Sequence, residues 1–226
     1  MATPIVLFDI DLTLIRTGGA GQRAMNRAAL DLYGRDGLFD KLEFAGRTDP
    51  AIIRDALQGR LGLDGRWPHE YPRFLSRYLA LLEEELTRSA GVTLPGVISL
   101  LEALRADGTV RLGLATGNVR AGARLKLRAH ALWDRFEDGG FADDSEDRAV
   151  LTRVARRRLG GGPAVVVGDS VHDVTAGHAA GARVLAVATG GHSVVALAEA
   201  GADSVLPDLG DVERSCGELW RLLGAS

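Results

Sequence analysis

The stretch IVLFDIDLTLIRTGG, residues 5–19, decides the fold. Four apolar residues run directly into Asp9, and Asp11 and Thr13 follow at intervals of two. A continuous apolar run of this kind is typical of a strand that is covered on both faces in a parallel sheet. Adjacent side chains of a strand point in opposite directions, so a second acid on the same side must come two positions later. The stretch therefore predicts a buried strand that ends in a pair of acids.

Further short apolar runs have the same character, and they lie at 110–116, 164–169, 183–189 and, more briefly, 204–207. Segments with helical periodicity alternate with them, at 97–107, 119–131, 148–159, 172–181, 193–200 and 211–223. Alternation of strands and helices is typical of the α/β class. We expect a doubly wound parallel sheet of the Rossmann-like kind.

Residues 18–91 interrupt this alternation, because they carry no strand signal. Three helical patterns take its place, at 20–34, 49–62 and 69–89. Asp49 before Pro50 predicts the N-cap and first turn of the second of these helices. Turn-prone segments flank the whole block, RTGG at 16–19 and GVTLPG at 91–96. We expect an all-helical cap domain at 18–92, inserted into an α/β core domain made of 1–17 and 93–226.

The composition argues against several classes of function. The 226 residues carry a formal net charge of −3, without the basic excess of a nucleic-acid-binding protein. No apolar run approaches the ~20 residues of a membrane span, and the N-terminus MATPIVLF lacks the features of a signal peptide. The single cysteine, Cys216, allows no internal disulfide and fits a reducing compartment. We expect a cytoplasmic monomer or homodimer that binds neither nucleic acid nor a membrane.

Polar residues follow the predicted strands at the end where open parallel sheets bind ligands. They are Asp9 and Asp11 after the first strand, Thr116, Gly117 and Asn118 after the second, and Asp169 and Asp173 after a later one. Each alone has a plain structural explanation, because such an Asp is often a helix N-cap and TGN is commonly a turn. Together, however, they gather four carboxylates at one edge, and these need a counter-charge. Mg²⁺ is the simplest one, and it also attracts phosphate oxygens.

Three segments resemble motifs of a known family. FDIDLT, LATGN and VVGDSVHD, in this order, look like the first, second and fourth motifs of the haloacid dehalogenase superfamily of phosphohydrolases. The helical insertion after the first strand resembles the helical cap of that family. Within the family, the chain is most similar to the phosphoglycolate-phosphatase-like branch. The resemblance implies a Mg²⁺-dependent phosphatase that hydrolyses a small phosphorylated metabolite through an aspartyl-phosphate intermediate.

The resemblance also implies roles for the acids. Asp9 would be the nucleophile, and Asp11 the general acid and then the general base. Asp9, the backbone carbonyl of Asp11, and Asp169 would hold Mg²⁺, with support from Asp173. Thr13 would brace the loop after the first strand.

Substrate contacts are implied for a second group of residues. Thr116 would donate a hydrogen bond to the phosphoryl oxygens, together with the backbone N–H groups of Gly117 and Asn118. Arg47, in the segment GRTD of the cap, is a candidate for contact with a substrate anion, and solvation is the alternative.

The sequence departs from the family pattern at two places. Leu12 stands where a glycine usually follows the second acid. The third motif usually supplies a lysine, but the corresponding region reads DDSEDRAVL. We expect Arg148 to supply this cation, unless it is only a solvated residue at a helix start. Lys126 is the other candidate; it lies between Arg124 and Arg128 on a helix that we expect at the surface, so Arg148 is preferred.

Other activities of the same fold are to be weighed. A β-phosphoglucomutase-type phosphotransferase shares the acid pair, and the motifs do not separate it from a phosphatase. A 2-haloacid dehalogenase needs neither Asp11 nor a metal. A phosphonoacetaldehyde hydrolase would replace Asp11 by a small residue and use a cap lysine, for which Lys41 is the sole candidate. A non-catalytic binding module would not require intact Asp9, Asp11 and Asp169.

Overall fold

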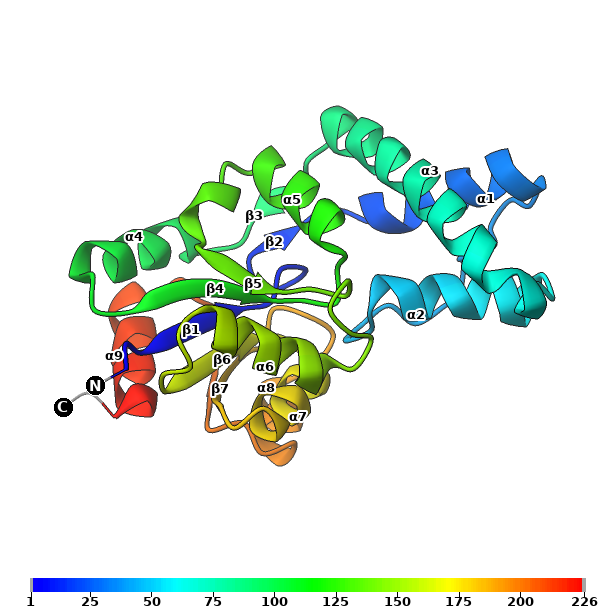
Figure 1. The fold of residues 1–226 in the computed structure, drawn as a ribbon. Helices are drawn as coiled ribbons and strands as arrows, with labels where there is room; N and C mark the ends of the chain where they lie inside the picture. Colours follow the sequence, from blue (N-terminus) through cyan, green and yellow to red (C-terminus); the bar gives the residue numbers. More distant parts are fainter. Residues whose placement is uncertain (1, 225–226) are drawn as a thin grey trace.

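Six parallel strands form the central sheet of the protein, for which a computed structural model describes residues 2–224 (Figure 1). Their order is β5-β4-β1-β6-β7-β8, so that β1 lies between β4 and β6. The strands are β1 (Ile5–Phe8), β4 (Arg111–Ala115), β5 (Asp138–Gly140), β6 (Ala164–Gly168), β7 (Arg183–Val187) and β8 (Ser204–Leu206). The predicted doubly wound α/β fold is confirmed.

Helices cover both faces of this sheet (Figure 1). One face carries α4 (Val97–Asp107), α5 (Arg120–Ala129) and α9 (Val212–Leu223), and the other carries α6 (Arg148–Arg158), α7 (Val171–Ala179) and α8 (Val194–Glu199). Along β1, Val6 and Phe8 join the hydrophobic core on the first face, and Ile5 and Leu7 join that on the second. Because both sides of β1 are buried, its sequence is an unbroken apolar run.

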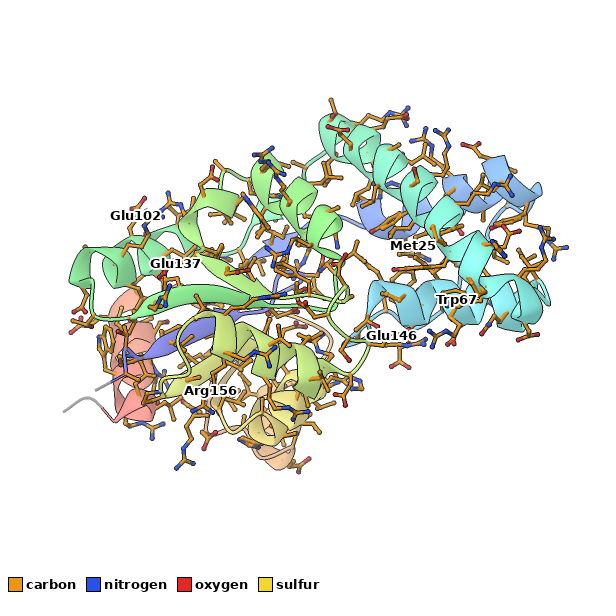
Figure 2. The ribbon with its side chains drawn as sticks, viewed as in Figure 1. Met25, Trp67, Glu102, Glu137, Glu146 and Arg156 are labelled. Carbon is orange, nitrogen blue, oxygen red and sulfur yellow. The ribbon has the colours of Figure 1, made fainter. Side chains whose placement is uncertain are left out.

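Three helices form a separate block at one end of the molecule (Figure 1). They are α1 (Ala20–Tyr33), α2 (Asp49–Arg54) and α3 (Trp67–Arg88). They bury a hydrophobic core of their own around Met25, Phe39, Phe74 and Tyr78, and Figure 2 shows Met25 between these helices. We call residues 18–92 the cap, and the domain limits 1–17, 18–92 and 93–226 stay predictions. Within residues 2–224, no helix combines the length and the apolar composition that crossing a membrane requires.

Two short pairings were not predicted from the sequence. β5 is formed by Asp-Gly-Gly, which has little intrinsic strand preference, and it forms because β4 offers it an edge, with Gly113 opposite Asp138. The segments that join the cap to the core, expected only as turns, pair as the antiparallel strands β2 (Ile15–Arg16) and β3 (Val92–Thr93). The chain therefore enters and leaves the cap through a single two-stranded connection.

The second cap helix also differs from its prediction. It ends at Arg54 rather than at residue 62, and the chain continues as a π-helical segment, Asp55–Arg60. Its N-cap is Thr48, so that Asp49 is the first helical residue and not the predicted cap. Short 3₁₀ turns at Asp64–Arg66 and Trp133–Arg135 complete the elements, and the other predicted helices and strands agree with the structure to within two residues.

Candidate active site

Three neighbouring strands bring predicted site residues to one edge of the sheet. Asp9 follows β1, Thr116 follows β4 and Asp169 follows β6. All three residues are buried, with at most 7% of their surface exposed. Since β1 lies between the other two strands, the side chains that follow these strands meet at the carboxyl end of the sheet.

An acidic cluster occupies this edge. Asp9, Asp169 and Asp173 each offer one carboxylate oxygen, and these oxygens lie within 4.8 Å of one another. Burial raises the pKa of Asp9 to about 7; the charge of Arg148 opposes this rise, and that of Asp173 adds to it. Burial also raises the pKa of Asp169 to about 8, with further contributions from Asp173 and Asp9. Carboxylates whose charge is this unfavourable in the protein alone suit a divalent cation, so the donor set fits Mg²⁺.

The side chain of Asp11 does not belong to the acidic cluster found within residues 2–224. Its Oδ2 accepts hydrogen bonds from Lys126 Nζ at 2.6 Å and from Asn118 Nδ2 at 2.8 Å. Both bonds end on the same oxygen, so Oδ1 has no protein partner among the described residues. The metal role predicted for Asp11, through its backbone carbonyl, does not involve this side chain.

Lys126 is a buried cation of this site, and the expectation that its helix presents it to solvent is wrong. Only 7% of its side chain is exposed. Besides its bond to Asp11, Nζ donates to Asn118 Oδ1 at 2.7 Å. Burial alone lowers the pKa of a lysine, but the charges of Asp11 and Asp49 outweigh burial and raise the pKa of Lys126. Lys126 is therefore charged at neutral pH.

Asn118 links Lys126 to Thr116. Its Oδ1 accepts from the ammonium group, which can only donate, so its Nδ2 must be the atom that faces Asp11 and Thr116. Nδ2 donates to Thr116 Oγ1 at 2.8 Å, and the backbone N–H of Asn118, predicted to face a phosphoryl group, donates to the same oxygen at 3.3 Å. Because Oγ1 accepts both bonds, the hydroxyl proton of Thr116 remains available for an acceptor in the adjoining cavity.

Arg148 contacts the acidic cluster directly. Its guanidinium donates to Asp173 Oδ1 and lies 3.6 Å from Asp9 Oδ1. With 12% of its side chain exposed, it is not the solvated residue that the sequence left as an alternative. The other oxygen of Asp173, Oδ2, accepts from the N–H and the hydroxyl of Ser170, the N-cap of α7. Asp173 thus caps a helix and holds Arg148 at the same time.

Hydrogen bonds also fix the loop that follows β1. Thr13 Oγ1 donates to Asp169 Oδ1 at 3.3 Å, and the hydroxyl of Thr189 donates to the carbonyl of Leu12. Leu12 has a φ of +62°, in the left-handed region that glycine adopts without strain. The conformation that a glycine usually provides is therefore kept here by a leucine, with its side chain in the cavity wall.

A cavity of about 430 Å³ adjoins these groups, lined by residues of both core and cap. Phe44 and Ile52 give its cap wall an apolar character. Arg47 lines the cavity, and its guanidinium is paired with Asp55 at 2.7 Å. Asp49 lines it too, and burial raises the pKa of Asp49 to about 6 against the opposing charge of Lys126.

Two residues of this site were not assigned to it from the sequence. Lys126 was ranked below Arg148, although its position on the inner face of its helix carries a usable signal. Asp49 was taken for a helix cap, and no local pattern reveals its real contact, which joins positions 70 residues apart.

Comparison with known proteins agrees with this geometry. The family described as haloacid dehalogenase-like hydrolase matches residues 6–187. The chain is 28% identical over 229 residues to "Probable phosphatase IndB" of Dickeya dadantii, covering 97% of this chain and 96% of that protein. It is 27% identical over 213 residues to a phosphoglycolate phosphatase of Nitrosospira multiformis, covering 90% and 91%. The crystal structure of CbbY from Rhodobacter sphaeroides in complex with phosphate has the same fold, with a TM-score of 0.70, 20% identity and coverage of 94% and 96%.

The chain therefore belongs to the haloacid dehalogenase-like hydrolase family. Within that family it is an enzyme of the phosphoric monoester hydrolase class.

Proposed function

We propose that the protein is a Mg²⁺-dependent phosphatase that hydrolyses a small phosphomonoester through an aspartyl-phosphate on Asp9. One observation carries the proposal: Asp9, Asp11, Lys126 and Arg148 line a single cavity of about 430 Å³ beside the acidic cluster. A phosphoryl group in this cavity would meet a buried carboxylate, a second carboxyl for proton transfer and two cations. These are the groups that phosphoryl transfer through a covalent intermediate requires.

Asp9, Asp169 and the backbone carbonyl of Asp11 would hold Mg²⁺, and Asp173 would support them. The raised pKa values of Asp9 and Asp169 favour this assignment, because a bound cation restores the ionised form of both. When bound, Mg²⁺ supplies positive charge to the phosphoryl oxygens and reduces their repulsion of the attacking carboxylate.

The first half of the reaction forms the aspartyl-phosphate. A carboxylate oxygen of Asp9 attacks phosphorus while the bond to the leaving oxygen breaks, and Asp11 gives that oxygen its proton. Lys126 and Asn118 hold Oδ2 of Asp11, which reserves Oδ1 for the proton transfer. The hydroxyl of Thr116 donates to a phosphoryl oxygen.

The second half returns the enzyme to its starting state. Water attacks the phosphorus of the aspartyl-phosphate, and Asp11, now ionised, accepts a proton from this water. The P–O bond to Asp9 breaks, inorganic phosphate leaves, and Asp9 is again a carboxylate. Arg148, 3.6 Å from Asp9 Oδ1, stabilises the carboxylate that is released.

The cavity limits the substrate to a small molecule. Its apolar wall, with Phe44 and Ile52, suits a short carbon frame, and Arg47, which is paired with Asp55, is a candidate partner in the same cavity for a second anionic group of the leaving alcohol. Phosphoglycolate, the substrate after which the Nitrosospira relative is named, has this composition. We further propose that the enzyme acts in the cytoplasm as a monomer or homodimer, which is consistent with its single cysteine.

Phosphate release from a panel of phosphomonoesters, which includes phosphoglycolate and sugar phosphates, tests the proposal with and without Mg²⁺. We expect Mg²⁺-dependent release, loss of release in Asp9→Asn, and a phosphorylated Asp9 after quenching, detected by mass spectrometry. An isomerised sugar phosphate without free phosphate would assign the chain to β-phosphoglucomutase-type transfer instead. No phosphate and no isomer from any member of the panel would contradict both activities.

A further inference from the structure

The cap touches the phosphate-binding loop through one buried acid. The backbone N–H of Asp49 donates to the carbonyl of Gly117 at 2.7 Å, and Asp49 Oδ2 accepts from the backbone N–H of Val119 at 2.9 Å. Asp49 belongs to cap helix α2, whereas Gly117 and Val119 belong to the segment between β4 and α5 of the core. Only 7% of Asp49 is exposed, so both hydrogen bonds are shielded from water.

Asp49 provides a side-chain acceptor for the N-terminus of helix α5, which has none in its own segment. The N-cap of α5 is Val119, whose side chain cannot accept a hydrogen bond, and no side chain of its own segment caps the helix. Helix N-termini leave backbone N–H groups unpaired unless a neighbouring side chain accepts them. Two side chains from outside the helix accept its first N–H groups: Asp49 of the cap accepts that of Val119, and Asp143 of the core accepts that of Arg120. The cap therefore supplies one of the two acceptors at the N-terminus of a core helix.

The surfaces at this contact approach too closely for ordinary side chains. A Cβ at Gly117 would lie 2.2 Å from the carbonyl oxygen of Arg47, and a Cβ at Gly46 would lie 2.1 Å from the ring of His172. The absence of a side chain at Gly117 lets segment 46–49 sit directly on segment 117–119, and its absence at Gly46 lets the same segment sit against His172 at the start of α7. The docked position of the cap is thus specified by its backbone.

An exposed ion pair also crosses this boundary. Arg54 of α2 pairs with Glu146 of the core, and their side chains are 40% and 34% exposed. Figure 2 shows Glu146 beside α2, with Trp67, over which the Arg54 guanidinium stacks, near the same end of the cap. Exposed pairs of this kind contribute little, because water competes for both charges. The bonds of Asp49 are therefore the main polar link between α2 and the loop.

We propose that Asp49 is a positioning residue, which couples docking of the cap to the geometry of the loop Thr116–Asn118. The proposal rests on the proposed function, in which Thr116 faces the phosphoryl group. Asn118 directly precedes Val119 and is bonded to Thr116, so the hydrogen bond that fixes Val119 also restrains these two side chains. With the cap undocked, the Val119 N–H loses its acceptor and the loop loses this restraint, while Asp143 of the core still holds the Arg120 N–H. The full phosphate-binding geometry then exists only when the cap covers the cavity, which directs turnover toward substrates that fit beneath it.

Two substitutions separate this role from a general effect on folding. Asp49→Ala removes the acceptor of the Val119 N–H. Asp49→Asn removes the charge but keeps a carbonyl oxygen that can accept the same bond. Asp64→Ala is the matched control, because Asp64 is an exposed acid of the cap that takes no part in the cavity.

Hydrogen exchange measured by mass spectrometry gives the first readout, and it needs no turnover. We expect the amides of residues 117–122 to exchange at least tenfold faster in Asp49→Ala than in the wild type, and at the wild-type rate in Asp64→Ala. The second readout is the affinity for inorganic phosphate in the presence of Mg²⁺, measured by calorimetry. We expect the Kd to rise about tenfold in Asp49→Ala, a loss of about 1.4 kcal/mol, and to recover to within threefold of wild type in Asp49→Asn.

Each contrary outcome overturns the proposal. Unchanged exchange at 117–122 in Asp49→Ala would show that the bond does not hold the loop. If exchange is faster throughout the chain in Asp49→Ala, the Asp49→Asn variant tests the proposal instead. An Asn variant that binds phosphate as weakly as the Ala variant would show that the charge of Asp49, and not its hydrogen bond to Val119, is the relevant property. If only the phosphatase assay fails, the proposed function is contradicted. The exchange rates at residues 117–122 then still test whether Asp49 holds the loop.

Discussion

Replacement of Lys126 by methionine tests the charge network around Asp11. Methionine has a similar length and no charge, so Lys126→Met removes both donated hydrogen bonds without opening a large cavity. Asp11 Oδ2 then keeps only Asn118 as a partner, and Asn118 Oδ1 keeps none. Both side chains gain rotational freedom at the place where we propose that a proton is transferred.

The magnitude follows from the exposure of the two acceptors. Asn118 is 5% exposed, so an unpaired Oδ1 costs about 1–3 kcal/mol. The side chain of Asp11 is 39% exposed, so water replaces part of the lost bond and its contribution is about 1 kcal/mol. If about 1.4–2.8 kcal/mol of this total is lost from the transition state, kcat falls about 10- to 100-fold.

The assay is steady-state phosphate release with the best substrate of the panel, together with the melting temperature of each variant. Arg124→Met is the matched control, since Arg124 lies on the exposed face of the same helix and should retain wild-type kcat. A folded Lys126→Met enzyme with kcat within threefold of wild type would refute the reasoning. It would mean that Asn118 alone orients Asp11.

Three further predictions concern the acidic cluster. Asp9→Asn should lower phosphate release about a thousandfold or more while the circular dichroism spectrum is unchanged, because it removes only the nucleophile; residual turnover above one per cent would contradict this. Arg148→Met should leave Asp173 as a buried charge without an ion-pair partner. It should lower kcat about 100-fold and destabilise the fold by about 3 kcal/mol in urea unfolding. An unfolding midpoint equal to that of the wild type would contradict the predicted loss of stability. The pKa values of about 7 for Asp9 and about 8 for Asp169 lie above the ordinary 3.8, so protonation stabilises the metal-free fold. This stabilisation is full below about pH 4, decreases as pH rises, and is gone above about pH 8. Mg²⁺ must displace these protons, so its Kd in calorimetry should fall about tenfold per pH unit for each proton released between pH 6 and 8, and a flat profile would exclude the coupling.

Lys126 illustrates how sequence neighbours mislead on a helix. Arg124 and Arg128 are exposed, and they suggested that the residue between them is exposed as well. Residues two apart on an α-helix point about 200° apart, however, so Lys126 faces nearly the opposite way. It lies on the face that buries Ala123 and Leu127 against the sheet. The rotation between successive residues of the helix, rather than the charge of the sequence neighbours, would have placed Lys126 on the buried face.

The parts of the fold that were predictable are those whose signal is local. β1 and β6 are continuous apolar runs, and the helices of the core are periodic, so both follow from residues within one element. β5 is a strand only because it pairs with β4, and such a partner cannot be read from Asp-Gly-Gly itself. The contact of Asp49 with Val119 depends on where the cap sits on the core. No pattern along the chain encodes that placement.

The sequence left open whether Arg148 or Lys126 supplies the cation of the third motif. In the structure each of them contacts a different acid. Arg148 is bonded to Asp173 and lies near Asp9, whereas Lys126 is bonded to Asp11. In the proposed reaction Asp9 attacks as a carboxylate, and Asp11 gives up a proton and later takes one back. A cation beside an acid favours its ionised form, so Arg148 suits Asp9 as the attacking carboxylate, and Lys126 suits Asp11 after it has given up its proton. Each cation is held by a different element, α6 and α5, and of the two only α5 is bonded at its start by Asp49. Docking of the cap should therefore act on Lys126, Asn118 and Thr116 and leave the nucleophile with Arg148 in place.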